Sequence, residues 1–175
     1  MLESILTEES QQVLLNLPKP RKAFDKETPE DLNSLTLGQL FDLQGAVESE
    51  NMRTIVTECA RLLLGVAPLK VLRSRADHAI GFALWVMREL ERIGKMWKAI
   101  TPPPSPEAVQ AGVDKLDFGR FGMVDWYAQR MGISDHDKVL ELPWVRVFEC
   151  MRIDNERGAF QDRLREIMSK QSRKQ

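Results

Sequence analysis

The stretch WYAQRMGISDHDKVLELPWVRVF, residues 126–148, has the pattern of two helical runs joined by a tight turn and followed by a third run. The first run ends at Gly132, a residue that accepts the left-handed conformation with which helices close. Ser134 is the expected N-cap of the short second run, and Pro143 opens the third. This order is that of a helix-turn-helix, so the chain either reads DNA or uses the motif to build a lobe.

The charges of the second run argue against DNA. Residues 134–142 carry Asp135, Asp137 and Glu141 against Lys138 alone. A recognition helix meets the phosphate backbone closely, and basic residues supply much of its affinity. We therefore interpret the motif as a structural helix-turn-helix and keep a DNA-binding regulator as the second alternative.

Helical periodicity also fills the rest of the chain, and strand patterns are nearly absent. The sequence predicts an all-α protein with under about 5% strand. Thr36 is the expected N-cap of the second helix, Gly65 the expected C-cap of the third, and Pro68 the start of the fourth. The predicted helices are 3–17, 36–49, 50–64, 68–99, a short one from Pro106, 118–131, 135–142 and 143–168.

Proline composition sets the predicted domain boundaries. TPPPSPE, residues 101–107, cannot continue a helix and favours stiff polyproline II. We expect two small helical lobes joined by a proline-rich linker, and a structural helix-turn-helix in the second lobe. The lobes are residues 1–100, with a long central helix over 68–99, and residues 107–175, with 101–106 as linker. The polar stretch 19–34 is interpreted as an extended connector.

Composition places the chain among globular proteins. It has 43% hydrophobic and 29% charged residues, and its net charge of −1 gives the whole molecule no bias toward polyanions. The acidic N-terminus does not resemble a signal peptide, and no run is long and apolar enough to span a membrane. Cys59 and Cys150 are far apart and are expected to be reduced, buried thiols.

No pattern in the sequence predicts catalysis, a metal or a cofactor. Nucleotide-binding, hydrolase and metalloprotease motifs are absent, and two histidines with two cysteines are too few for a Cys/His metal site. Asp135, His136 and Asp137 are adjacent at a helix start, so their side chains diverge rather than meet on one ion. His78 has no sequence neighbour that would polarise it. The chain is expected not to be an enzyme.

The predicted central helix carries a basic face. Residues 1–66 sum to −5, whereas residues 67–100 sum to +4. This face is either solvated and paired with the acidic first part, or a docking surface for an acidic partner or RNA. Its members are Lys70, Arg73, Arg88, Arg92, Lys95 and Lys98.

Two stretches resemble a known family. LTLGQLFDLQ (residues 35–44) resembles the opening helix of small tail assembly chaperones of tailed bacteriophages, and residues 121–167 are similar to their C-terminal portion. In the second stretch the similar elements are VLELPW, residues 139–144, and the helix ending FQDRLREI, residues 160–167. The run 68–99 and the triple-proline stretch have no counterpart in that pattern.

The resemblance implies a helical protein made in the cytoplasm of an infected bacterium. It would bind the long, helical tape-measure protein of the phage tail and help recruit tail-tube subunits. Self-association is left open, and neither a membrane nor nucleic acid is an expected partner. The alternative is a structural virion component, such as a connector or inner tail protein.

A chaperone of this kind has to offer an apolar helix face to its client. We assign partner binding to apolar residues of the two stretches and to part of the basic face. These residues are Leu37, Leu40, Phe41, Trp144, Phe148, Arg88, Arg92 and Lys95.

Overall fold

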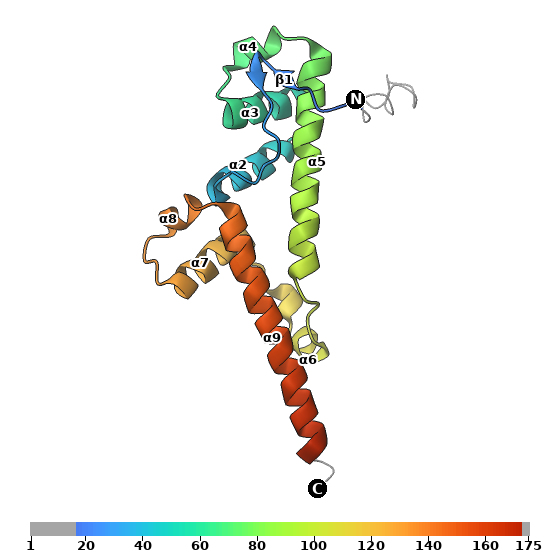
Figure 1. Cartoon of the computed structure of the whole chain (residues 1–175), viewed down its shortest axis with the longest axis vertical. Coiled ribbons are helices and arrows are strands. Elements are labelled where there is room, and N and C mark those ends of the chain that lie inside the picture. Colours follow the sequence, from blue (N-terminus) through green and yellow to red (C-terminus); the bar gives the residue numbers. More distant parts are fainter. Residues whose placement is uncertain (1–16, 173–175) are drawn as a thin grey trace. The chain divides into compact units, whose positions relative to one another are not determined.

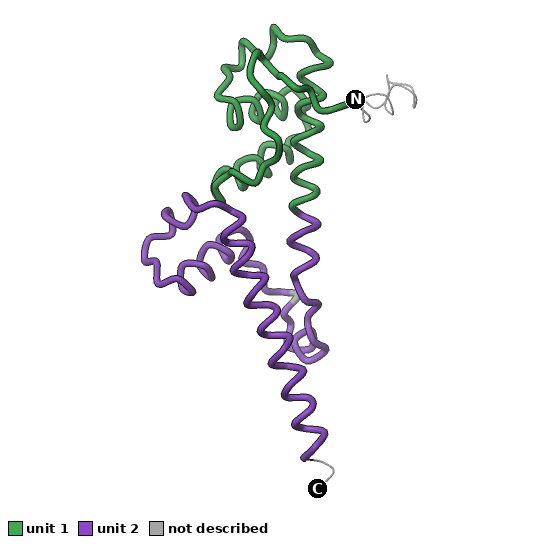
Figure 2. Tube along the Cα trace, viewed as in Figure 1, with its two compact units in different colours: residues 1–93 green, residues 94–175 purple. Residues whose placement is uncertain are grey.

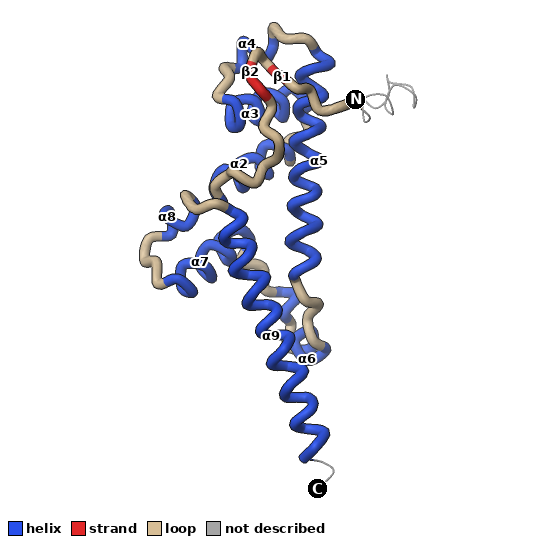
Figure 3. The backbone as a smooth tube through the Cα atoms, in the orientation of Figure 1, coloured by secondary structure: helices blue, strands red, loops and turns tan. Residues whose placement is uncertain are grey.

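The computed structural model describes residues 17–172, and within that range it is mostly helical (Figure 1). The one departure from the predicted all-α class is a two-stranded hairpin near the N-terminal end of the described range (Figure 3). The predicted helix over 3–17 lies outside the described residues except for Leu17. Among the described helices, none combines the length and the apolar character that crossing a membrane requires.

Two compact units divide the chain, residues 1–93 and 94–175 (Figure 2). The division falls inside the longest helix of the first half, and the triple-proline stretch lies within unit 2. The structure thus places its division before the proline stretch that sequence analysis took as the linker. The longest helix of the first half ends at Ile100, just before the prolines. This end is still joined to the rest of unit 2, because Asn155 Nδ2 donates to the carbonyl oxygen of Ile100 at 2.9 Å.

Unit 1 begins with the hairpin, formed by β1 (Lys22–Ala23) and β2 (Lys26–Glu27). The strands are antiparallel, with Ala23 opposite Lys26. The prediction of an extended connector over 19–34 is wrong, because Ala23, Phe24 and Leu32 are buried in the core of this unit. Three apolar residues in a polar stretch were too few to reveal the hairpin.

Helices α2 (Leu37–Val47) and α3 (Met52–Leu64) follow, and their ends are capped by side chains and glycine. Thr36 forms a capping box with Gln39, as the backbone N–H of each donates to the side-chain oxygen of the other at 3.0 and 3.2 Å. Asn51 caps α3, and Gly65 closes it with φ +58°. The predictions for Thr36 and Gly65 are confirmed.

The predicted single helix over 68–99 is wrong at its start. Helix α4 (Pro68–Leu72) begins at Pro68 as expected, but it stops after five residues, and α5 (Ala76–Ile100) begins anew. The carbonyl oxygen of Val71 accepts both the backbone N–H and the hydroxyl of Ser74, at 3.1 and 2.6 Å. This local bond pulls the backbone into a turn, which periodicity does not reveal.

The core of unit 1 gathers on the first half of α5. Phe82 is fully buried, with its ring 5.7 Å from the ring of Phe24 and 5.7 Å from that of Trp85. Trp85 is also buried there. Other buried members are Leu37, Leu40, Leu43, Ile55, Val56, Cys59, Val86 and Ile93.

Unit 2 contains the end of α5, four shorter elements and the longest helix. Helices α7 (Gly119–Met131) and α8 (His136–Leu140) lie in the stretch where a structural helix-turn-helix is expected, and α7 closes at Gly132 with φ +66°. The N-cap of α8 is Asp135 rather than the predicted Ser134, since the Asp135 carboxylate accepts from the N–H of Asp137 at 3.0 Å. The remaining elements are α6 (Pro106–Gln110), the 3-10 helix η1 (Val113–Lys115) and α9 (Trp144–Ser172).

The core of unit 2 lies among α7, α8 and the first turns of α9. Trp144 is fully buried, and its ring centroid is 6.1 Å from that of Phe148. Trp97, predicted in the first lobe, belongs to unit 2 and packs edge-on against Phe148 at 5.1 Å. The other buried residues of this unit are Val124, Tyr127, Ala128, Val139 and Val147.

Candidate interaction surface

The C-terminal half of α9 is a free helix. Every residue from 156 to 172 is exposed, whereas the first turns of the same helix are buried. Figure 1 shows this half running past the other helices of unit 2. At 1.5 Å per residue it is about 25 Å long, which is enough to lie along another helix for several turns.

One face of this free helix is apolar. Phe160, Leu164, Ile167 and Met168 keep 53%, 39%, 55% and 59% of their surface exposed. At 3.6 residues per turn they fall within an arc of about 100°. We call these four residues the α9 stripe. Four large apolar side chains in contact with water on one face are the usual mark of an interaction site.

The root of the free helix is fastened to unit 2. The guanidinium of Arg130 on α7 donates two hydrogen bonds to the Asp154 carboxylate, at 2.7 and 3.2 Å. These bonds hold the pKa of Asp154 below its usual value. Together with the hydrogen bond from Asn155 to Ile100, they attach α9 to the rest of unit 2. The attachment lies just before the exposed half of the helix begins.

Ion pairs along the free half support its helical state. Arg165 Nη1 lies 3.2 Å from Asp162 Oδ1, and Lys170 pairs with Glu166 four residues earlier. The Lys170 hydrogen bond lowers the pKa of Glu166. Pairs three or four residues apart favour the helical state of an exposed segment, although solvent screens them strongly. These charges lie off the stripe and leave its apolar face open.

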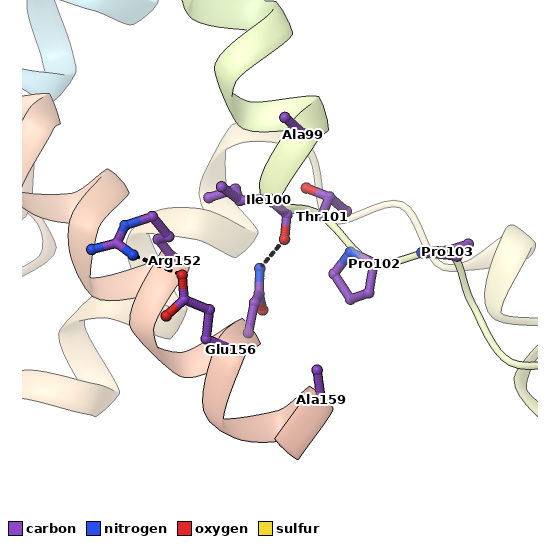
Figure 4. A pocket seen from close by; sticks show the side chains of 9 residues that line it. Ala99, Ile100, Thr101, Pro102, Pro103, Arg152, Glu156 and Ala159 are labelled. Atoms are coloured by element: carbon purple, nitrogen blue, oxygen red, sulfur yellow. Dashed lines mark hydrogen bonds and ion pairs between the residues drawn. The ribbon is translucent and has the colours of Figure 1, made fainter. Parts of the chain in front are cut away.

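A hollow of about 350 Å³ lies beside the root of the free helix (Figure 4). The end of α5 and the prolines line one side, and Arg152, Glu156 and Ala159 of α9 line the other. Arg152 Nη1 lies 2.7 Å from Glu156 Oε1. The only acid in its lining is thus paired with a base, which leaves no free acid–base group for chemistry in this hollow.

A second exposed apolar group lies at the start of α7. Phe118 is 69% exposed, and Leu116 and Phe121 are exposed to a similar degree. The Phe121 ring is 5.2 Å from the His136 ring, and His136 Nε2 is 3.3 Å from Asp125 Oδ1. His136 is therefore held by α7 side chains and serves the packing of α8.

Most of the apolar residues assigned to partner binding lie in the cores. Leu37, Leu40, Trp144 and Phe148 are buried, and Phe41 is half-buried. The leucines belong to unit 1 and the other two to unit 2, so these residues do not form one site within either unit. Their role in binding stays a prediction, and it would require these cores to open.

The basic residues assigned to partner binding make contacts within their own unit where their bonds are defined. Arg88 donates to the carbonyl oxygens of Leu84 and Leu17, at 3.2 and 2.8 Å. Arg92 is paired with Glu89 at 2.9 Å and also donates to the Asn33 amide oxygen at 3.1 Å. Lys95, at the start of unit 2, is exposed. Arg88 and Arg92 thus fasten other segments to α5.

Metal and thiol chemistry find little support in the described part of the chain. No group of three or more histidine, cysteine or acidic side chains within residues 17–172 is arranged to hold a metal ion. Cys59 is fully buried, and burial raises the pKa of its thiol to about 12. A thiol held in its neutral form is a poor nucleophile.

Comparison with known protein families, with curated proteins and with solved structures finds no match to this chain. The resemblance of residues 35–44 and 121–167 to tail assembly chaperones therefore stays a prediction.

Sequence reasoning counted the stripe residues among the apolar positions of the last helix and did not select them as a site. The sequence signal that could have found them is the small number of large apolar residues in this part of the helix. Only these four occur between residues 156 and 172. A helix with so narrow an apolar face cannot be wrapped by its own chain on several sides.

Proposed function

We propose that the chain is a non-catalytic protein-binding factor that holds a helical client protein along the α9 stripe. The observation that carries the proposal is the exposed half of α9, with four large apolar side chains on one face. An amphipathic helix recognises another helix by burying such a face, with anchors spaced three and four residues apart. The flanking charges keep the free helix in solution until the client binds.

We further propose that the client is a long helical protein of the tape-measure type and that the factor acts in phage tail assembly in the infected cell. The support for this setting is the two stretches that resemble tail assembly chaperones, residues 35–44 and 121–167. The second stretch contains Phe160, Leu164 and Ile167 of the stripe. A role as a structural virion component is the rival, because it needs the same exposed face.

The test is a pull-down from phage-producing cells combined with mass spectrometry of purified particles. A chaperone is expected to capture the tape-measure protein and to be missing from mature particles. Presence in particles at a fixed copy number would favour the structural component. Capture of no tail protein would contradict the phage setting.

A matched pair of variants tests the stripe in the same experiment. The double change Phe160→Asp and Ile167→Asp places charges on the stripe and is expected to abolish capture without lowering the melting temperature, because both residues are exposed. Ser169→Asp is the control, since it adds a charge about 180° around the helix from Phe160. Equal loss of capture in both would contradict binding by the stripe.

A further inference from the structure

A hollow of about 580 Å³ lies in unit 1, and none of its lining residues belongs to the α9 stripe. Three elements form it: the turn of the β1–β2 hairpin, the end of α4 and the first turn of α5. Its lining residues are Lys22, Phe24, Asp25, Lys70, Arg73, Ser74, Arg75 and His78. Its volume is that of a small-molecule pocket.

The lining is strongly basic. Four side chains are cationic and only Asp25 is acidic. Asp25 Oδ2 lies 3.0 Å from Lys70 Nζ, and Arg75 is held by Asp77 at 2.9 Å. Within residues 17–172, Lys22 and Arg73 form no ion pair. Two cations thus remain uncompensated in a concave place, where a field of one sign concentrates anions.

The backbone of the hairpin turn is strained at this place. Phe24 and Asp25 have φ values of +54° and +64°, and they are the only non-glycine residues with positive φ among those described. Two-residue turns of this type normally use Asn-Gly, because side chains crowd the left-handed region. Burial of Phe24 against Phe82 holds the turn in place. Backbone conformations that are strained, and are held in place by the surrounding structure, occur frequently at ligand-binding sites.

The start of α5 adds to the positive potential. This helix is 25 residues long, and its first turn, with Arg75 just before it, faces the same hollow. The N-terminal end of a helix carries partial positive charge and favours an anion. The negative charge of Asp77 offsets part of this positive potential. Its carboxylate also accepts two hydrogen bonds from Arg75.

We propose that this hollow binds a small, multiply charged oxyanion of the phosphate class, such as pyrophosphate or a phosphomonoester. The Arg73 guanidinium offers forked hydrogen-bond donors that match phosphate oxygens, and the ammonium group of Lys22 adds a point charge. The volume of about 580 Å³ is that of a small-molecule pocket, which favours a compact ligand over a nucleic-acid strand. This site lies in unit 1 and stands independently of the proposed client binding.

The test is isothermal calorimetry with inorganic pyrophosphate on the full chain at low ionic strength. We expect saturable binding at one site, weakened by added salt. Arg73→Gln and Lys22→Gln should each weaken it about tenfold, as loss of a charge-assisted hydrogen bond does. Asp25→Asn should strengthen it, because it removes the only carboxylate in the lining.

Arg53→Gln is the matched control, since Arg53 is an exposed base of the same unit outside the hollow. Its affinity should equal that of the unaltered chain, and melting temperatures without ligand should confirm that all four variants fold. Absence of saturable binding in the unaltered chain would overturn the proposal, as would equal weakening in Arg53→Gln. Tight binding of a short RNA that pyrophosphate does not displace would also overturn it.

Discussion

Cys59 shows how burial governs a single residue. The thiol has no exposed surface, and its pKa rises from the usual 9.0 to about 12 because the buried site disfavours the thiolate. In the unfolded chain the thiol ionises at its usual pKa. The folded state therefore loses stability relative to the unfolded state as the pH rises above 9, and keeps it fully below that value.

We expect the free energy of unfolding to fall by about 1.4 kcal/mol between pH 7 and pH 10 through this residue. Urea unfolding of the unaltered chain and of Cys59→Ala at both pH values measures the difference. The variant should lack this part of the loss, and Cys150→Ala, which keeps Cys59, should retain it. An equal fall in all three proteins would contradict the role of Cys59.

Caps at individual residues were predictable because their chemistry is local. Thr36 and Gly65 act as predicted. A threonine just before a helical run and a glycine just after one are recognisable caps, because their capping bonds involve only nearby residues. The choice between Ser134 and Asp135 as cap of α8 was not predictable, because both are good caps and packing of the following residues decides. The strained turn at Phe24 was also not predictable. Its partner in the core, Phe82, is distant in sequence, so no local pattern indicates the contact.

At the scale of elements, glycines distinguish a crowded helix from a free one. A Cβ at Gly122 in α7 would lie 2.7 Å from the Cβ of Phe118, whereas a Cβ at Gly158 in α9 would meet nothing within 4 Å. The first contact is closer than atoms tolerate, and the Phe118 Cβ is tied to the backbone. The second position is open, as expected for a free helix.

We expect Gly158→Ala to stabilise α9 by about 0.5–1 kcal/mol, because alanine loses less backbone entropy in a helix. Gly122→Ala should lower the melting temperature of unit 2 despite the same gain in propensity. Circular dichroism melts of the two variants measure this contrast. If Gly122→Ala were as stabilising as Gly158→Ala, the close packing of Phe118 would be contradicted.

The existence of most helices was predictable, but their continuity was not. Periodicity located α2, α3, α7 and α9 closely. It joined α4 and α5 into one helix, because the interruption rests on a side-chain bond of Ser74 rather than on glycine or proline. Conversely, the triple-proline stretch looked like a boundary between lobes and instead lies inside unit 2.

At the scale of the whole molecule, the exposed and buried apolar residues divide differently from the prediction. Sequence analysis assigned partner binding to residues such as Leu40 and Trp144, which fold into the cores of units 1 and 2. Apolar spacing is the same for a core face and for a docking face, and only the arrangement of the rest of the chain separates them. The α9 stripe is an apolar face that the other described residues leave exposed.

The central claim is that the free half of α9 is where the client binds. Hydrogen–deuterium exchange of the full chain, alone and with the captured tape-measure protein, tests this most directly. Helical amides at 156–172 should exchange fast in the isolated protein, because no side chain of the described part of the chain buries this half of α9. The account predicts strong slowing of exchange over 156–172 with the client bound and little change in α7. Unchanged exchange over 156–172, with protection appearing in unit 1 instead, would contradict it.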